Sequence, residues 1–160
     1  MTVIENVKAA CGRDTRYNLL DAVFRTPRFW SAERAVTEKA MELLSICGLE
    51  DSADVLASSL PYGRQRKLEI ARALATDMKV LLLDEPAAGM NPTETAELLS
   101  CIHAIRDRFG VAILLIEHDM SLVMNICQRI QVIDYGQAIA AGLPEEIARD
   151  PKVIAAYLGE

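Results

Sequence analysis

The stretch Val80-Leu81-Leu82-Leu83-Asp84-Glu85-Pro86 decides the fold of this chain. Its apolar residues Val80–Leu83 predict a short strand that is buried in a parallel sheet. Two adjacent carboxylates follow at the point where the strand ends. Open α/β sheets bind their ligands at the carboxyl ends of their strands. Asp84 and Glu85 are therefore candidates for chemistry at a sheet edge, and the alternative is a solvated acidic turn.

Two flanking segments favour a functional site at Asp84 and Glu85 over a solvated acidic turn. Upstream, Leu60-Pro61-Tyr62-Gly63-Arg64-Gln65-Arg66 runs into the helical pattern of Lys67–Leu74. Downstream, the apolar run Val111–Ile116 predicts a second strand, which is followed by Glu117-His118-Asp119. A glycine-containing turn that opens a helix, an acid pair after one strand and a histidine after the next strand thus follow one another along the chain.

This order of motifs resembles the C-terminal two-thirds of an ABC-type ATPase subunit, and the resemblance covers the chain from Met1 to Glu160. Four segments carry it: Leu60–Arg66 resembles the signature, Val80–Glu85 the Walker B strand, Gly89–Asn91 the D-loop, and His118 the switch histidine. Further details resemble the ATPase subunits of branched-chain (hydrophobic) amino-acid importers. These details are Pro61–Gly63, Pro86–Pro92, Ile116–Met120, Tyr157–Glu160 and the insertion-like Phe24–Phe29.

The resemblance implies an α/β fold, namely the C-terminal part of a P-loop NTPase-like ABC ATPase core with a helical subdomain. The core would be part of a mostly parallel sheet flanked by helices, as the alternation of strands and helices also indicates. Residues 1–75 would form a partial helical (signature) subdomain. Residues 76–160 would form the part of the core with the Walker B, D-loop and switch-histidine segments.

The resemblance also assigns roles to the residues at the strand ends. Asp84 is the candidate Mg²⁺ ligand, because Mg²⁺ keeps several waters and needs few carboxylates from the protein. Glu85 is the candidate general base, or the group that orients the attacking water. His118 would hydrogen-bond the γ-phosphate or that water, and the alternative is a satisfied core histidine.

The signature segment would contact ATP that is held by a second subunit. Free amides at the start of the helix near Gly63 offer an anion site. Pro61 stands where the family has a serine and cannot donate a hydrogen bond, which leaves the Gly63 amide for the phosphate. The alternative role of Tyr62 is packing against the helical subdomain. For Asn91, a helix cap and a contact across subunits are equally favoured. The candidate ATP-binding residues are Leu60, Pro61, Tyr62, Gly63, Arg64, Gln65 and Asn91.

Two elements of such an ATPase do not occur in this sequence. None of the eight glycines is followed by lysine, so no G-x-x-x-x-G-K-[ST] loop is present to cradle phosphates. The family's Q-loop, which normally precedes a stretch like Met1–Val7, is also absent. We therefore expect a truncated form that is not active alone.

The resulting functional prediction is an ATP-binding and ATP-hydrolysing importer subunit for branched-chain amino acids, with ATP and Mg²⁺ as cofactors. A second ATPase subunit, identical or different, and transmembrane permease subunits are the expected partners. The expected location is the cytoplasm, at the inner face of the plasma membrane. Two alternatives remain: a non-catalytic structural or regulatory remnant, and the C-terminal lobe of an SMC-type ATPase, for which heptads and basic patches would be expected.

Composition argues against several other classes of function. The net charge of −6 and the pI of about 5.0 argue against a nucleic-acid surface. No apolar run approaches the ~20 residues that cross a bilayer. The four cysteines form no C-x-x-C pair, and neither His103 nor His118 is spaced with them for zinc, so we expect buried thiols.

The remaining local patterns predict further elements. Thr2 and Glu5 form a capping box, and residues 12–30 read as a loop or a helical hairpin. Asn91 caps a helix that runs to Arg108. A helix is expected after Ser31, with Gly48 after its end and with the apolar stripe Val36, Ala40, Met41, Leu44 and Ile46. A polar linker over 51–59 follows. Further along, we expect a helix over Leu122–Cys127, a hairpin over 129–140 that turns at Tyr135-Gly136, and helices that start at Pro144 and Pro151.

Overall fold

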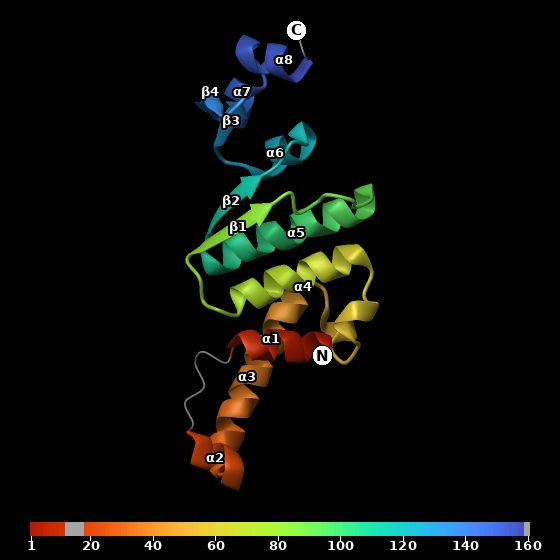
Figure 1. The fold of residues 1–160 in the computed structure, drawn as a ribbon, viewed down its shortest axis with the longest axis vertical. Coiled ribbons are helices and arrows are strands. Elements are labelled where there is room, and N and C mark those ends of the chain that lie inside the picture. Colours follow the sequence, from red (N-terminus) through yellow and green to blue (C-terminus); the bar gives the residue numbers. More distant parts are fainter. Residues whose placement is uncertain (12–17, 159–160) are drawn as a thin grey trace. The chain divides into compact units, whose positions relative to one another are not determined.

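The structure is a computed structural model, and it describes residues 1–11 and 18–158 of the chain (Figure 1). The described residues form two compact units. Unit 1 comprises Met1–Leu82 and Pro86–Leu114, and unit 2 comprises Leu83–Glu85 and Leu115–Glu160. The chain passes from one unit to the other within its first two strands.

Five helices build most of unit 1, with two short 3-10 turns before the fourth. They are α1 (Val3–Cys11), α2 (Leu19–Phe24), α3 (Pro27–Ile46), α4 (Tyr62–Leu74) and α5 (Pro92–Phe109), and the turns are Glu50–Ser52 and Ala57–Ser59. Helix α1 packs against α3 and α4, and α5 packs against the same two helices. The fully buried side chains of this core include Val3, Val7, Leu44, Leu49, Leu98 and Ile105.

The polar caps that were predicted for α1 and α5 are present. Thr2 N donates to Glu5 Oε2 at 2.8 Å, and Glu5 N donates to Thr2 Oγ1 at 3.3 Å. Asn91 and Glu94 form the same reciprocal pair at the start of α5. Gly110, with a φ of 59°, ends α5 in the left-handed conformation that glycine adopts without penalty.

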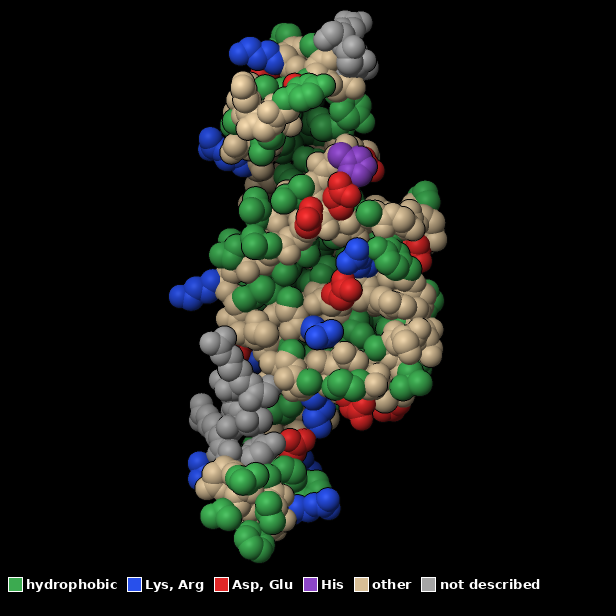
Figure 2. Space-filling model, in the orientation of Figure 1, with side chains coloured by type: hydrophobic (Ala, Val, Ile, Leu, Met, Phe, Trp, Pro, Cys, Tyr) green, Lys and Arg blue, Asp and Glu red, His purple; other side chains and the backbone are tan. Residues whose placement is uncertain are grey.

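The region 12–30 forms a helical hairpin where it is described, and residues 12–17 lie outside the described residues. Helix α3 begins at Pro27 rather than after Ser31, because Thr26 caps it and proline suits the first helical position. The insertion-like segment Phe24–Phe29 spans the last residue of α2, the connecting residues Arg25 and Thr26, and the first residues of α3. Apolar side chains gather on the surface over α2, where Leu19 and Phe24 are 79% and 74% exposed (Figure 2).

Strands β1 (Val80–Asp84) and β2 (Ala112–Ile116) pair in one sheet, and α5 connects them (Figure 1). Ala112 N donates to Lys79 O at 3.0 Å, and Glu85 N donates to Ile116 O at 2.9 Å, so the two strands run in the same direction. Burial alternates along β1: Leu81 is 4% exposed, whereas Leu82 is 68% exposed. The predicted parallel strand is present, but the prediction that it is buried holds for one face only within the described residues.

Unit 2 contains a small antiparallel sheet and three short helices. Its elements are α6 (Met120–Ile126), β3 (Ile130–Asp134), β4 (Gln137–Gly142), α7 (Pro144–Ile147) and α8 (Pro151–Leu158). The predicted hairpin is confirmed, and its turn residues Tyr135 and Gly136 have φ values of 44° and 78°, as a two-residue I′ turn requires. Val123, Ile130, Ile147 and Val153 form the core of this unit.

The elements thus combine a parallel strand pair that carries a crossover helix with an antiparallel hairpin, and the α/β prediction is confirmed. In the part of the chain that the structure describes, no helix has both the length and the apolarity to span a bilayer.

Candidate functional site

The end of β1 brings the predicted base and the predicted switch histidine together in unit 2. His118 Nδ1 lies 3.2 Å from Glu85 Oε1, within hydrogen-bond distance. Both side chains are accessible, at 51% exposure for Glu85 and 77% for His118. The backbone fixes this arrangement, because Glu85 N is bonded to Ile116 O on β2, two residues before the histidine.

Glu85 has an unusual backbone conformation. Its φ of 42° lies in the left-handed region, which non-glycine residues seldom occupy because of steric cost. Such strained residues occur often at functional sites, where the surrounding structure holds them in place. Here the ladder bond to β2 holds the residue while the chain turns sharply after the strand.

Glu117, which directly precedes the histidine, is a second acid beside it. The Glu117 side chain is only 3% exposed, and its Oε2 lies 3.9 Å from His118 Nδ1. The same oxygen accepts a hydrogen bond from His118 N at 3.3 Å. The histidine ring is therefore flanked by two carboxylates, one buried and one accessible.

Asp84 is the last residue of β1, and it is exposed. Its carboxylate has no hydrogen bond or ion pair within residues 1–11 and 18–158. Nor do these residues include a group of three or more side chains that could hold a metal ion. One accessible carboxylate fits Mg²⁺, which is usually bound through one or two carboxylates together with waters and substrate phosphates. Asp84 would therefore bind Mg²⁺ as part of a metal–nucleotide complex.

The signature segment lies in unit 1 and forms the start of α4. Helix α4 begins at Tyr62, so Gly63 falls within the first turn, where it is buried. Gln65 holds the preceding residues, since its Nε2 donates to Leu60 O at 2.8 Å and its backbone N donates to Pro61 O at 3.0 Å. Leu60 itself is only 6% exposed and anchors the turn.

Other signature side chains are also engaged within unit 1. Arg64 donates to Ser52 Oγ at 2.6 Å. This bond connects α4 to the segment 51–59, which was predicted to be a polar linker. Tyr62 Oη accepts a hydrogen bond from Arg66 Nε at 3.0 Å, and the Arg66 guanidinium lies 5.3 Å from the ring centre. The Tyr62 ring also lies near Gly89 of the D-loop-like segment: a Cβ added to Gly89 would lie 3.8 Å from Cε1 of the ring. Tyr62 therefore contacts both its own helix and the loop before α5.

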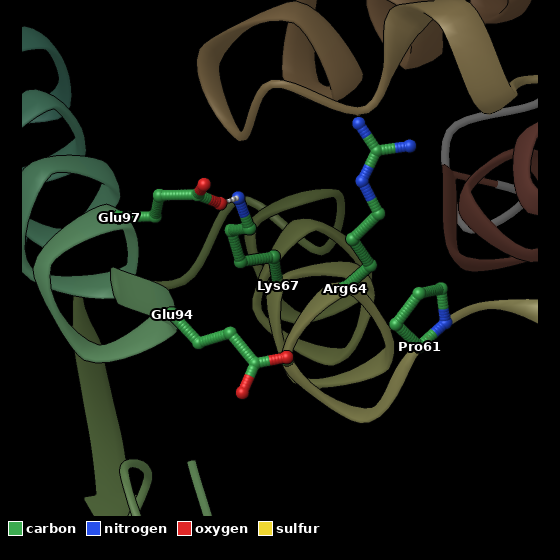
Figure 3. A pocket seen from close by; sticks show the side chains of 6 residues that line it. Pro61, Arg64, Lys67, Glu94 and Glu97 are labelled. Carbon is green, nitrogen blue, oxygen red and sulfur yellow. Dashed lines mark hydrogen bonds and ion pairs between the residues drawn. The ribbon is translucent and has the colours of Figure 1, made fainter. Parts of the chain in front are cut away.

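A small cavity lies between the starts of α4 and α5 (Figure 3). Its volume is about 170 Å³, below the roughly 300 Å³ of common small-molecule sites, so it is not a nucleotide pocket by itself. Lys67, with a side chain 8% exposed, makes a 2.7 Å ion pair with Glu97 across this cavity. The hydrogen bond and charge of Lys67 lower the pKa of Glu97. The lining residues are Pro61, Gly63, Arg64, Lys67, Glu94 and Glu97.

Glu94 links the signature turn to the cap of α5. Its Oε2 accepts a hydrogen bond from Asn91 N at 3.0 Å, while Asn91 Oδ1 accepts from Thr93 N and Glu94 N, both at 3.0 Å. A Cβ added to Gly63 would lie 3.1 Å from the Glu94 carboxyl carbon. The capping role predicted for Asn91 is confirmed. The sequence pattern gave no sign that Glu94 reaches Gly63.

Comparison with known proteins identifies the class first. The family model described as "ABC transporter" matches residues 1–88, and the chain belongs to that family. A second model, described as "Branched-chain amino acid ATP-binding cassette transporter", matches residues 139–160. The predicted resemblance to the branched-chain type of ABC ATP-binding protein is thereby confirmed.

Individual relatives agree with this assignment. The high-affinity branched-chain amino acid transport ATP-binding protein LivG of Salmonella typhimurium is 48% identical over 160 residues, all of this chain and 63% of LivG. BraF of Pseudomonas aeruginosa, which has the same description, is 47% identical over the same shares. The chain therefore spans less than two-thirds of the length of these relatives.

Solved structures show the same fold. The ADP conformation of MJ1267, an ATP-binding cassette of an ABC transporter, matches with a TM-score of 0.76 and 32% identity, over 100% of this chain and 63% of that one. The cbiO1 protein of Clostridium perfringens matches with a TM-score of 0.77 at 24% identity, over 96% of this chain and 55% of that one, and supports the fold alone. The partial ABC cassette fold that was predicted is confirmed.

Proposed function

We propose that this chain supplies the acid pair, the histidine and the signature turn of an ATP-hydrolysing subunit that drives the import of branched-chain amino acids. Membership of the ABC transporter family and the similarity to LivG and BraF support this proposal. The observation that carries it is the 3.2 Å contact between Glu85 and His118 at the end of β1, directly after the exposed Asp84.

Each residue of this cluster has a role that its position allows. Glu85 is accessible and can accept a proton from an attacking water or orient that water. His118 can hydrogen-bond the γ-phosphate or the same water while it contacts Glu85. Asp84 would hold Mg²⁺ of the nucleotide complex, and the bound ion would neutralise charge on the phosphates.

The signature turn acts, in this proposal, on ATP bound to a second ATPase subunit. Pro61 has no N–H, so the Gly63 amide and the start of α4 would face the phosphates. The bonds from Gln65 to Leu60 O and from Arg64 to Ser52 support this role by fixing the turn. Tyr62 and Asn91 would lie beside the nucleotide from the same unit.

Partners and location follow from the same proposal. A second ATPase subunit would complete each ATP site, and transmembrane permease subunits would carry the amino acid, with this subunit at the cytoplasmic face. The division into a helical subdomain over 1–75 and a core part over 76–160 belongs to this proposal. Because the sequence contains no G-x-x-x-x-G-K-[ST] loop, we propose that the chain needs other polypeptide to hydrolyse ATP.

The test uses a chimera in which the upstream part of Escherichia coli LivG precedes Met1. We expect Glu85→Gln to lower the ATP turnover rate by at least about 100-fold, or about 3 kcal/mol of barrier, while ATP binding persists. Glutamine keeps the shape of glutamate but is not a proton acceptor of that strength. His118→Ala should also slow turnover.

The matched control is Asp107→Asn, the same acid-to-amide change at a side chain that is 69% exposed on α5 and makes an ion pair with its neighbour Arg106. It should leave turnover unchanged. Normal turnover in Glu85→Gln would remove Glu85 from the reaction. Loss of turnover in the control as well would mean that the effect is not specific to the site. A chimera that binds ATP but never hydrolyses it would favour the non-catalytic alternative.

A further inference from the structure

Two cysteines meet in the interior of unit 1, apart from the candidate site. The Sγ atoms of Cys47 and Cys101 lie 3.3 Å apart although 54 positions separate the residues in the sequence. Cys47 directly follows α3, and Cys101 lies within α5. The two residues are 2% and 4% exposed, so the contact is part of the core packing.

The surroundings shift the pKa values of the two thiols in opposite directions. A hydrogen bond with the Cys47 thiol lowers the pKa of Cys101, although burial opposes this shift. The same interaction, followed by burial, raises the pKa of Cys47. The positive charge of Lys67 on α4 makes a smaller, lowering contribution to the pKa of each thiol. Cys101 Sγ donates to Cys47 Sγ in this contact, so the two sulfur atoms share one hydrogen bond in the core.

We propose that Cys47 and Cys101 form a reversible intramolecular disulfide when the folded chain meets a peroxide, and that they constitute a redox modification site. Their 3.3 Å separation carries this proposal. A disulfide has an S–S length of about 2.05 Å, so the sulfur atoms must approach by about 1.3 Å. Cys47 lies beyond the last residue of α3 and before Gly48, at a helix end, where such a shift disturbs few backbone hydrogen bonds.

The chemistry balances with hydrogen peroxide as the oxidant. One of the two sulfur atoms, as a thiolate, attacks one peroxide oxygen, which breaks the O–O bond and, after proton uptake, yields a sulfenic acid and one water. The other sulfur then attacks the sulfenic sulfur, and its proton leaves with the hydroxyl group as a second water. Two thiols and one peroxide thus give one disulfide and two waters.

The disulfide would link Cys47, directly after α3, to Cys101 in α5. It would close a loop that contains the signature turn and the whole of β1, and cross-linking a loop of this length limits the unfolded chain strongly. We therefore expect oxidation to raise the Tm of unit 1 by roughly 5–10 °C, an increase that a thiol reductant should reverse.

The experiment treats the reduced, folded 160-residue chain with a small molar excess of hydrogen peroxide. Peptide mapping by mass spectrometry without reduction should find one cross-linked peptide pair that contains Cys47 and Cys101. The thiols that can be titrated after denaturation should fall from four to two. Dithiothreitol should restore all of them and return the Tm to its starting value.

Two variants separate this pair from the other cysteines. Cys127→Ser removes a thiol that is partly exposed in unit 2, and it should leave the cross-link and the rise in Tm intact. Cys101→Ser should abolish both. The peptide map of the unmodified chain decides the matter even if Cys101→Ser does not fold. Cross-links through other cysteines, or oxidation of Cys127 while Cys47 and Cys101 both remain alkylatable, would overturn the proposal.

Discussion

Replacing Gly63 by alanine tests how the first turn of α4 fits against the cap of α5. Alanine is better than glycine in a helix by about 0.5–1 kcal/mol, so the change should stabilise α4 on its own. The new Cβ, however, would lie 3.1 Å from Cδ and Oε1 of Glu94 and 3.2 Å from its Cβ, closer than ordinary van der Waals contact. Glu94 would have to move away.

The cost of that movement can be worked out from the contacts of Glu94. Its carboxylate accepts a hydrogen bond from Asn91 N at 3.0 Å, and losing such a bond costs about 1 kcal/mol. The gain and the loss nearly cancel, so Gly63→Ala should change the free energy of unfolding by less than about 0.5 kcal/mol. In a Glu94→Ala background the contacts with Cδ and Oε1 are gone and only the 3.2 Å contact with the Cβ of residue 94 remains, so the same change should stabilise by up to about 0.5–1 kcal/mol. The predicted coupling energy is about 1 kcal/mol.

Urea unfolding followed by tryptophan fluorescence measures this cycle directly. Trp30 is the only tryptophan in the chain, and it lies in the same unit as Gly63 and Glu94. Four proteins are needed: the unmodified chain, each single variant and the double variant. An equal effect of Gly63→Ala with and without the Glu94 side chain would refute the contact between the two residues.

Three further outcomes are expected. Asn91→Ala should lower the free energy of unfolding by about 1 kcal/mol in the same urea assay, because two amides at the start of α5 lose their acceptor. Glu97→Gln should lower the Tm slightly at pH 7 and the free energy of unfolding by at most about 1 kcal/mol, since the Glu97 side chain is 56% exposed and water screens its pair with the buried Lys67. Because the pKa of Glu97 is lowered on folding, its contribution is present above the ordinary pKa of glutamate and is lost as the pH falls through the lowered value, so the Tm difference should vanish in acid. Calorimetric titration of this chain alone with Mg·ATP should give a Kd of about 1 mM or weaker, since no phosphate-cradling loop is present, and micromolar binding would contradict this.

Local signals in the sequence predicted most of the individual elements. The Thr2–Glu5 and Asn91–Glu94 pairs fix helix starts through neighbouring residues, and Tyr135-Gly136 fixes a hairpin turn, so each could be recognised without tertiary information. The start of α3 was placed too late because Thr26 and Pro27 form a weaker signal than the apolar stripe that follows.

Contacts between distant residues could not be predicted in this way. Lys67 pairs with Glu97, and Cys47 meets Cys101, because the packing of α3, α4 and α5 brings those positions together. Burial of β1 was inferred from its run of apolar residues, but such a run does not specify which layers are present to cover each face. The sequence placed Glu85 and His118 at the same sheet edge, but the direct contact between their side chains was not predicted.

The most direct test of the proposed division of roles is the ATPase rate of a mixed dimer. This chain would carry an affinity tag and be purified together with an intact subunit such as Escherichia coli LivG, so that every active dimer contains one copy of each. We expect Gly63→Asp in this chain to abolish the remaining activity, because it adds a second carboxylate beside Glu94 at the start of α4, the helix end that would face the phosphates of ATP held by the partner. Gly63→Ala adds a Cβ without the charge and should retain activity. His118→Ala should have no effect, since no phosphate-cradling loop of this chain faces that residue. A mixed dimer that tolerates Gly63→Asp, or that loses activity with His118→Ala, would contradict these roles.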